Sequence, residues 1–548
     1  GSLALQQNTT ASNNTGIGNA ALRYNTTGTK NTAVGSLTLD ANTTSNDNTA
    51  VGYQALTSNT DGAGNTALGR DALRDNTIAD NCTAVGLVSL QSNVTGTSNT
   101  AVGAGALQDT TTGSQNTALG KDSLRTNTTG QDNTAVGMDS MRLNTTGKQN
   151  VAIGQNSLEA NTTANNNVAI GYESLKLNTT GANNTAVGTV ALDANTTGTN
   201  NIAIGYNALG LNTTAHNNTA VGQSSLGANT TGSENTAVGA NALDANTTAT
   251  NNVAFGYLAL TSTTTGGSNT AIGRSALANN TAGNNVAVGA SAMIMNTTGT
   301  QNVAVGTLAL DANTTGNYNI AVGYESLTSN TTGYEQTAVG HSALASNTEG
   351  ITNTAIGSAV LANNTIGDRN TGIGREALKY NTTAVNNSAV GQEALKFTTT
   401  GSYNTASGNN ALKANTTASY NSAFGNDALM DCTTGANNTA VGKSAMQSTT
   451  TGGANTAVGR HALKNNTTGV QNVALGSTAL TSNTTANNNT AVGYNTLALN
   501  TTGADNVALG VESLDANTTG DSNTAVGYRA LTSNTEGKRN TAIGKSAL

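Results

Sequence analysis

The chain has 548 residues, with no proline, no tryptophan, 3% aromatic residues and 9% charged residues. So few bulky side chains exclude a large rounded core, and the net charge of −7, spread thinly with no basic stripe, argues against a nucleic-acid partner. No run approaches the roughly 18 apolar residues of a membrane span, so we expect no span in this stretch.

A five-residue phrase, Asn-Thr-Ala-Val-Gly in its commonest form, repeats along the whole chain. Its glycine stands at Gly1 and then at every 17th residue to Gly273; after one 16-residue step to Gly289, the 17-residue spacing continues to Gly544. Such a period is typical of repeat architectures, in which each unit packs on its neighbours. We therefore expect one continuous array over residues 1–548, and, because both ends cut the repeat, a fragment of a longer chain.

We number the positions of one repeat from the asparagine that opens the phrase. Position 4 is apolar in nearly every repeat, as at Val34 and Val51, and position 2 is threonine exchanging with valine or isoleucine. Alternate residues of a strand share a face, so positions 2 and 4 are predicted to lie on one inward face, with position 2 inward or half-buried. The alanine at position 3 is then predicted to point the other way, where its small size implies a second surface close by. Glycines at position 5, such as Gly35 and Gly52, are predicted to make a corner.

The second half of each repeat holds a second apolar position. Position 9 is leucine almost throughout, as at Leu39 and Leu56, which predicts a second short strand with a buried side chain. The Asn-Thr-Thr-Gly segment at positions 12 to 15 is predicted to form another turn. Charged residues fall only at positions 6, 7, 10, 11, 14, 16 and 17, which we interpret as the outer surface.

These features predict an all-β fold, a parallel β-roll or β-solenoid of about 32 coils. A helical repeat is rejected because glycine, asparagine and paired threonines recur too densely for helix interiors. Disorder is rejected because the apolar residues keep a strict phase along the chain.

The asparagine at position 12 supports two interpretations. Stacked coils would align these side chains in a column, where each amide can hydrogen-bond the next. The same residues are N-x-Thr sequons, so regular glycans are the alternative, and the turn-and-ladder interpretation is favoured. A less regular series of sequons occurs at position 17, as at Asn183 and Asn217. The candidate glycosylation sites at position 12 include Asn25, Asn42, Asn144, Asn161, Asn178 and Asn195.

No residues suggest catalysis or cofactor binding. The three histidines are far apart in the repeat frame, no carboxylate pair recurs in a buried frame, and no phosphate-binding loop is present. Cys82 and Cys432 each replace an asparagine of the repeat, which indicates small substitutes rather than a redox or metal pair. Tyrosines at position 6, such as Tyr206, are interpreted as scattered surface aromatics rather than sugar-stacking platforms. We therefore expect no enzyme, no cofactor and no metal site.

The phrase Asn150-Val-Ala-Ile-Gly154 resembles the head repeats of YadA-like trimeric autotransporter adhesins, and similar strings resemble those of phage tail-fibre and bacterial surface-fibre proteins. The resemblance covers the whole chain, although the Asn-Thr-Thr segment lengthens each turn. It implies a left-handed parallel β-roll, a homotrimer with the small alanine column at its axis, and a role in adhesion at the cell surface.

These observations lead to a functional hypothesis. We expect a structural, extracellular or cell-surface fibre that associates with copies of itself and carries any recognition on its variable outer positions. The alternative is a glycan- or host-binding adhesin or tail-fibre module. A minor alternative is an ice-binding solenoid, which the exchange of threonine for valine at position 2 argues against.

Overall fold

The structure, a computed structural model, describes residues 1–548 and contains 32 strands of three residues each and no helix. The chain divides into two compact units, Gly1–Arg274 and Ser275–Leu548, and the division falls within the 16-residue repeat. The strands of the first unit are β1 (Thr15–Ile17), β2 (Thr32–Val34), β3 (Thr49–Val51), β4 (Thr66–Leu68), β5 (Thr83–Val85), β6 (Thr100–Val102), β7 (Thr117–Leu119), β8 (Thr134–Val136), β9 (Val151–Ile153), β10 (Val168–Ile170), β11 (Thr185–Val187), β12 (Ile202–Ile204), β13 (Thr219–Val221), β14 (Thr236–Val238), β15 (Val253–Phe255) and β16 (Thr270–Ile272). Those of the second are β17 (Val286–Val288), β18 (Val303–Val305), β19 (Ile320–Val322), β20 (Thr337–Val339), β21 (Thr354–Ile356), β22 (Thr371–Ile373), β23 (Ser388–Val390), β24 (Thr405–Ser407), β25 (Ser422–Phe424), β26 (Thr439–Val441), β27 (Thr456–Val458), β28 (Val473–Leu475), β29 (Thr490–Val492), β30 (Val507–Leu509), β31 (Thr524–Val526) and β32 (Thr541–Ile543).

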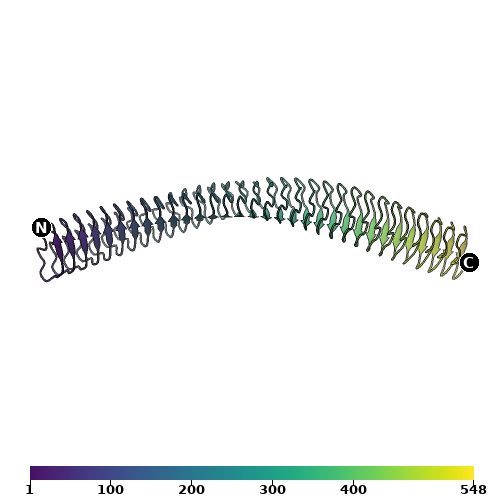
Figure 1. The fold of residues 1–548 in the computed structure, drawn as a ribbon, viewed down its shortest axis with the longest axis horizontal. Helices are drawn as coiled ribbons and strands as arrows, with labels where there is room; N and C mark the ends of the chain where they lie inside the picture. Colours follow the sequence, from purple (N-terminus) through teal and green to yellow (C-terminus); the bar gives the residue numbers. More distant parts are fainter. The chain divides into compact units, whose positions relative to one another are not determined.

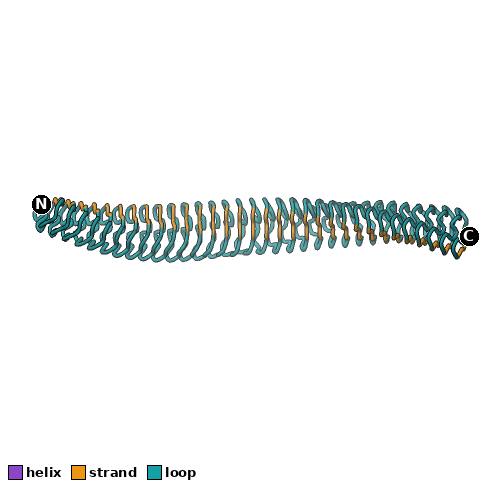
Figure 2. The backbone as a smooth tube through the Cα atoms, turned by 90° about the horizontal axis from the view of Figure 1, so that it is seen from below, coloured by secondary structure: helices purple, strands orange, loops and turns teal.

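Each unit is a parallel β-solenoid with one strand per coil, which confirms the predicted fold class and 17-residue repeat. Successive strands pair in parallel and in register, so that Ala186 of β11 lies beside Ala203 of β12. Figure 1 shows the coils of each unit side by side, and Figure 2 shows that the strands follow one another along one side of each unit. Equivalent residues of successive coils therefore form columns, about 4.8 Å apart along the stack.

The strands face the opposite way from the prediction. On β2 and β3 the central alanines are fully buried, whereas Val34 and Val51 are half-buried and point outward with the flanking threonines. The expectation that these two valines form the core is therefore corrected. The space between a strand and the chain segment opposite it is thin: a Cβ placed on Gly16, at the alanine position, would lie 3.1 Å from Cγ of Leu5. Only alanine or glycine fits this column, so the alanines face the interior of their own coil and are unavailable to a trimer axis.

The leucine at position 9 fills the interior, but it does not lie on a strand. Leu39 and Leu56 are fully buried in turns, with φ of 51° and 50°. This left-handed conformation is uncommon for leucine, and it recurs in successive coils. The second predicted strand is therefore replaced by an irregular segment whose backbone reverses direction while the leucine side chain points inward.

Backbone hydrogen bonds join the coils outside the strands as well. At position 7, the amide of Val190 donates to the carbonyl of Tyr172 in the preceding coil (3.0 Å), and at position 9 the amide of Leu192 donates to Ala208 in the following coil (2.9 Å). Gly188, at the corner after β11, has a φ of 136°, and a Cβ there would lie 2.5 Å from the carbonyl oxygen of Gly205. Glycine is required at this corner because the coils approach closely.

Candidate functional surfaces

The strand side of each unit is an exposed face made of positions 2 and 4. Position 4 is aliphatic or phenylalanine in every strand but β24, whereas position 2 is threonine or serine in most strands. Several of the apolar side chains are about half exposed, among them Ile204 (40%) and Phe255 (51%). None of the 32 strands carries a charged residue. Absence of charge therefore marks two different environments in this fold, the interior and this outward face, which the sequence pattern alone could not separate. We call this surface the strand face.

The position-12 asparagines form a buried ladder, as predicted. Nδ2 of Asn195 donates to Oδ1 of Asn178 in the preceding coil (2.8 Å) and to the carbonyl of Gly198 in its own coil (3.0 Å). The column occupies the end of the coil where the chain turns, and an asparagine that follows another asparagine in the column uses both of its amide hydrogens. The six candidate glycosylation residues are all fully buried, namely Asn25, Asn42, Asn144, Asn161, Asn178 and Asn195. The folded chain leaves no space for a sugar on their Nδ2 atoms.

A second buried ladder runs through the asparagines at position 1. Oδ1 of Asn184 accepts a hydrogen bond from the backbone amide of Asn201 (3.0 Å), and its Nδ2 donates to the carbonyl of Gly198 (2.8 Å). In the sequence this asparagine is recognisable only as the first residue of the repeated phrase, so its role in a ladder was not predicted. Its fully buried side chain closes the coil by joining the start of the strand to the last turn.

Both cysteines substitute for ladder asparagines and keep one of their hydrogen bonds. Sγ of Cys82, at position 1, donates to the carbonyl of Gly96, and Sγ of Cys432, at position 12, donates to that of Gly435, each at 3.2 Å. Burial raises the pKa of Cys82 to about 11 and that of Cys432 to about 12. Both are free thiols that stay protonated at neutral pH, so they lack the thiolate character of reactive cysteines.

Where another residue interrupts the position-12 ladder, buried polar atoms lose their partners. Asn93 precedes Thr110 in this column, and neither Oδ1 of Asn93 nor Oγ1 of Thr110 has a hydrogen-bond partner. Oδ1 of Asn415 is likewise unpaired beside Cys432. The complete ladder is thus a stabilising feature that a few coils lack.

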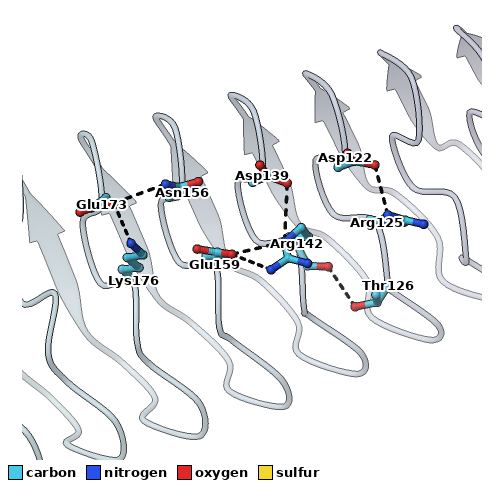
Figure 3. Close-up of polar contacts among 9 residues, drawn as sticks. All are labelled: Asp122, Arg125, Thr126, Asp139, Arg142, Asn156, Glu159, Glu173 and Lys176. Atoms are coloured by element: carbon cyan, nitrogen blue, oxygen red, sulfur yellow. Dashed lines mark hydrogen bonds and ion pairs between the residues drawn. The ribbon is translucent and has the colours of Figure 1, made fainter.

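The side chains at positions 6, 7 and 10 form a second surface, the polar side. Figure 3 shows these residues projecting from successive coils in the first unit. Arg142 pairs with Glu159 of the next coil at 2.7 Å and with Asp139 of its own coil at 3.5 Å, and Lys176 pairs with Glu173 at 2.6 Å. Because the coils are so close, ion pairs form both between successive coils and within one coil. Each of these two cations therefore lies beside a carboxylate.

The three histidines lie in different coils, His216 in the first unit and His341 and His461 in the second. Tyr324 stacks on His341, both at position 6 of successive coils, with ring centroids 5.6 Å apart. His216 is exposed and lies against a backbone carbonyl. No group of three or more His, Cys, Asp or Glu side chains is arranged to hold a metal ion. No helix has the length and hydropathy needed to cross a lipid bilayer.

The fold and these surfaces define the chain as a parallel β-solenoid repeat protein. A scan against models of protein families found no match, and a search of curated proteins found no relative. The likeness to YadA-like head repeats thus stays a prediction based on the repeat phrase.

Proposed function

We propose that this protein is a structural shaft of an extracellular fibre, and that copies of it associate through the strand face. The observation that carries this proposal is the uncharged strand face itself. The positions are exposed, yet charged residues are confined to the other surfaces of the coil. Extended apolar patches on a protein surface mark interaction sites.

A second copy of the chain is the partner that best fits this face. The side chains of the strand face have the same axial spacing on every copy. The columns of two copies can therefore stay in register over many coils. A strand of three residues, about 10 Å long, multiplied by one coil spacing gives a surface of about 50 Å² per coil. The 16 strands of one unit therefore present about 800 Å², which matches one partner's share of a standard protein interface. The repeat phrase favours a trimer, and the exposed aliphatic columns, rather than alanine, would meet at its axis.

The experiment is to place charges on the strand face and measure the molar mass by light scattering. The variant combines Val136→Lys, Val187→Lys and Val238→Lys, which lie on the third position of β8, β11 and β14. An unpaired ammonium buried at an interface costs several kcal/mol, so we expect this variant to be monomeric and the native chain to be oligomeric.

The matched control places three lysines in the same coils but at the exposed position 14. It combines Thr146→Lys, Thr197→Lys and Thr248→Lys, none of which donates a side-chain hydrogen bond. We expect the control to remain oligomeric. A native chain that is monomeric at all concentrations, or a control that dissociates equally, would refute association through the strand face. Surface labelling of intact cells tests the extracellular location.

One observation favours a second candidate function. The eight consecutive strands β1 to β8 all begin with threonine, and these threonines are exposed or half-buried, where an inward or half-buried position was predicted. A regular row of hydroxyls beside aliphatic side chains suits an ordered water layer, so ice binding is the second candidate. Thermal hysteresis measured on the monomeric protein tests it, and freezing behaviour like that of a matched non-binding protein would dismiss it.

A further inference from the structure

The second unit contains a segment whose charge is opposite to that of the chain. The chain has 22 Lys and Arg and 29 Asp and Glu, but the 96 residues from Arg369 to Lys464 contain eight of the cations and four of the anions. The segment thus has a net charge of +4 within a chain of −7. Seven of these cations are at positions 6 and 10, so stacking of the coils gathers them on the polar side.

The first part of this segment is an ion network with excess positive charge. Lys396 pairs with Glu376 (2.6 Å) and Glu393 (3.3 Å), Lys379 pairs with Glu376 (3.0 Å), and Lys413 pairs with Glu393 (2.5 Å). The guanidinium of Arg375 also lies 3.7 Å from Glu393, so four cations share two carboxylates and two positive charges are uncompensated. The pairs are near the surface and contribute little to stability. The side chains of Lys379 and Lys413 are 26% and 32% exposed, so a competing anion can reach them, whereas Lys396 is more deeply placed.

The second part is a group of cations without carboxylates. Lys443, Arg460 and Lys464 come from two successive coils, and none has a carboxylate oxygen within 4.0 Å. Burial lowers the pKa of His461, and the charges of these three residues lower it further, which shows that their fields converge on this ring. The coil spacing is shorter than the Debye length of about 8 Å at physiological salt, so their potentials add.

Aromatic rings lie beside the cations of the network. Tyr380 and Phe397 occupy position 11 of successive coils and stack with centroids 5.4 Å apart and planes 5° apart. The ammonium groups of Lys379 and Lys396 each lie 5.5 Å from the adjoining ring centroid. Phe397 is 40% exposed. Flat rings next to cations are suited to sugar units that carry an acidic group, because the ring covers the apolar sugar face and the cation binds the acid.

We propose that the polar side from Arg375 to Lys464 binds an anionic polysaccharide, bearing carboxylate or sulfate groups, laid along the stack of coils. The six coils concerned span about 25–30 Å at about 4.8 Å per coil, which is enough for several sugar units. This inference rests on the proposed function as a surface shaft, and it assigns that shaft a ligand class and a binding site. Single-stranded nucleic acid shares the charge and the stacking chemistry, and is the competing outcome.

The test measures binding of heparin and polygalacturonate to the full chain, with dextran as the neutral polysaccharide and oligo(dT) as the nucleic acid. The principal variant is Lys443→Gln, Arg460→Gln, Lys464→Gln. We expect it to weaken polyanion binding about tenfold or more, since three charge-assisted contacts to the ligand are lost. Binding should also weaken from roughly 50 mM to 500 mM salt, because the charges are exposed.

The matched control removes three cations elsewhere, by Lys148→Gln, Arg539→Gln and Lys545→Gln. These residues also have no carboxylate within 4.0 Å, so both variants change the net charge equally. We expect the control to bind within about twofold of the native chain. Equal weakening in both variants, no polyanion binding at low salt, or tighter binding of oligo(dT) than of either polysaccharide would overturn the proposal.

Light scattering on the same samples separates the two proposals. The cations lie on the polar side, so the principal variant should keep the native oligomeric state, and circular dichroism should confirm that it is folded. A monomeric native chain that still binds heparin through this cluster would refute self-association alone. An oligomeric chain that binds no polyanion would refute the polysaccharide site alone.

Discussion

Gly372 and Val360 are complementary: a Cβ on Gly372 would lie only 2.5 Å from Cγ1 of Val360. Gly372 stands where nearly all strands have alanine, and Val360 stands at position 8, where alanine is commonest. The larger side chain on one wall of the coil is thus matched by the smallest residue on the other. This relationship shows how little space separates the two walls.

The first prediction concerns this pair. Gly372→Ala should destabilise the second unit by about 1–3 kcal/mol, because the core would be overpacked. Val360→Ala should relieve that cost in the double variant, so the two changes should couple by about 1 kcal/mol or more. Chemical denaturation of the four proteins in the cycle measures the coupling. Additive effects would show that the two side chains do not compete for space.

The second prediction compares neighbouring asparagines. Asn364 donates to Asn347 (2.8 Å) and Gly367 (3.0 Å) and accepts from Asn381 (2.6 Å), whereas Asn363 is exposed. Asn364→Ala leaves the buried Oδ1 of Asn347 without a donor and takes from Nδ2 of Asn381 one of its two acceptors, the other being the carbonyl of Ala384. We expect a cost of about 1–3 kcal/mol from the group left unsatisfied. Asn363→Ala should change stability by less than about 0.5 kcal/mol. Thermal unfolding distinguishes them, and equal effects would contradict a stabilising ladder.

A third prediction is that repairing the ladder stabilises the fold. Thr110→Asn supplies an amide between Asn93 and Asn127, which are the ladder asparagines on either side. We expect about 1–3 kcal/mol of stabilisation from satisfying buried polar atoms. Because a long repeat array does not unfold in one step, local hydrogen exchange of the surrounding amides is the suitable measurement. Unchanged or faster exchange there would count against the ladder.

The fourth prediction concerns the stability of the second unit at acid pH. Hydrogen bonds from Lys396 and then Lys379 lower the pKa of Glu376 to about 2, whereas the unfolded chain has its usual value near 4.3. A lowered folded-state pKa means that the pairing stabilises the fold above about pH 4.3 and that this contribution disappears as the pH falls to about 2. Glu376→Gln should reduce the slope of stability against pH in this window, by no more than about 1 kcal/mol in total for a surface pair. An unaltered slope would show that the pairing does not form in solution.

A fifth prediction distinguishes the two series of sequons. After secretion from a glycosylating host, folded protein should carry no sugar on Asn161 or Asn178, because their amides are buried in the ladder. The exposed sequon asparagines Asn183 and Asn217, at position 17, can carry glycans without disturbing the fold. Mass spectrometry of glycopeptides from the folded fraction tests this, and a glycan on Asn161 in folded protein would disprove the ladder assignment.

The period, the parallel stacking and the asparagine ladder could be predicted from the sequence because identical residues must align when coils stack. The orientation of the strand could not. Val187 is more hydrophobic than Ala186, so hydropathy favours burying the valine, but the thin interior accepts only the alanine. The left-handed backbone conformation of Leu192 could not be predicted either. A regularly spaced leucine is equally typical of a strand, and nothing in the neighbouring residues distinguishes the two. The cation cluster arises only when residues 17 apart become neighbours.

The hydrogen bonds between coils also determine how each unit would respond to force. They run along the stack, so a pull on the two ends of a unit would load the last coil first and peel it away before the next. Each released coil would lengthen the chain by about 50 Å, because 17 extended residues span about 58 Å against a rise of about 4.8 Å. The shaft would therefore extend in many small equal steps and absorb mechanical work that a single cooperative rupture could not.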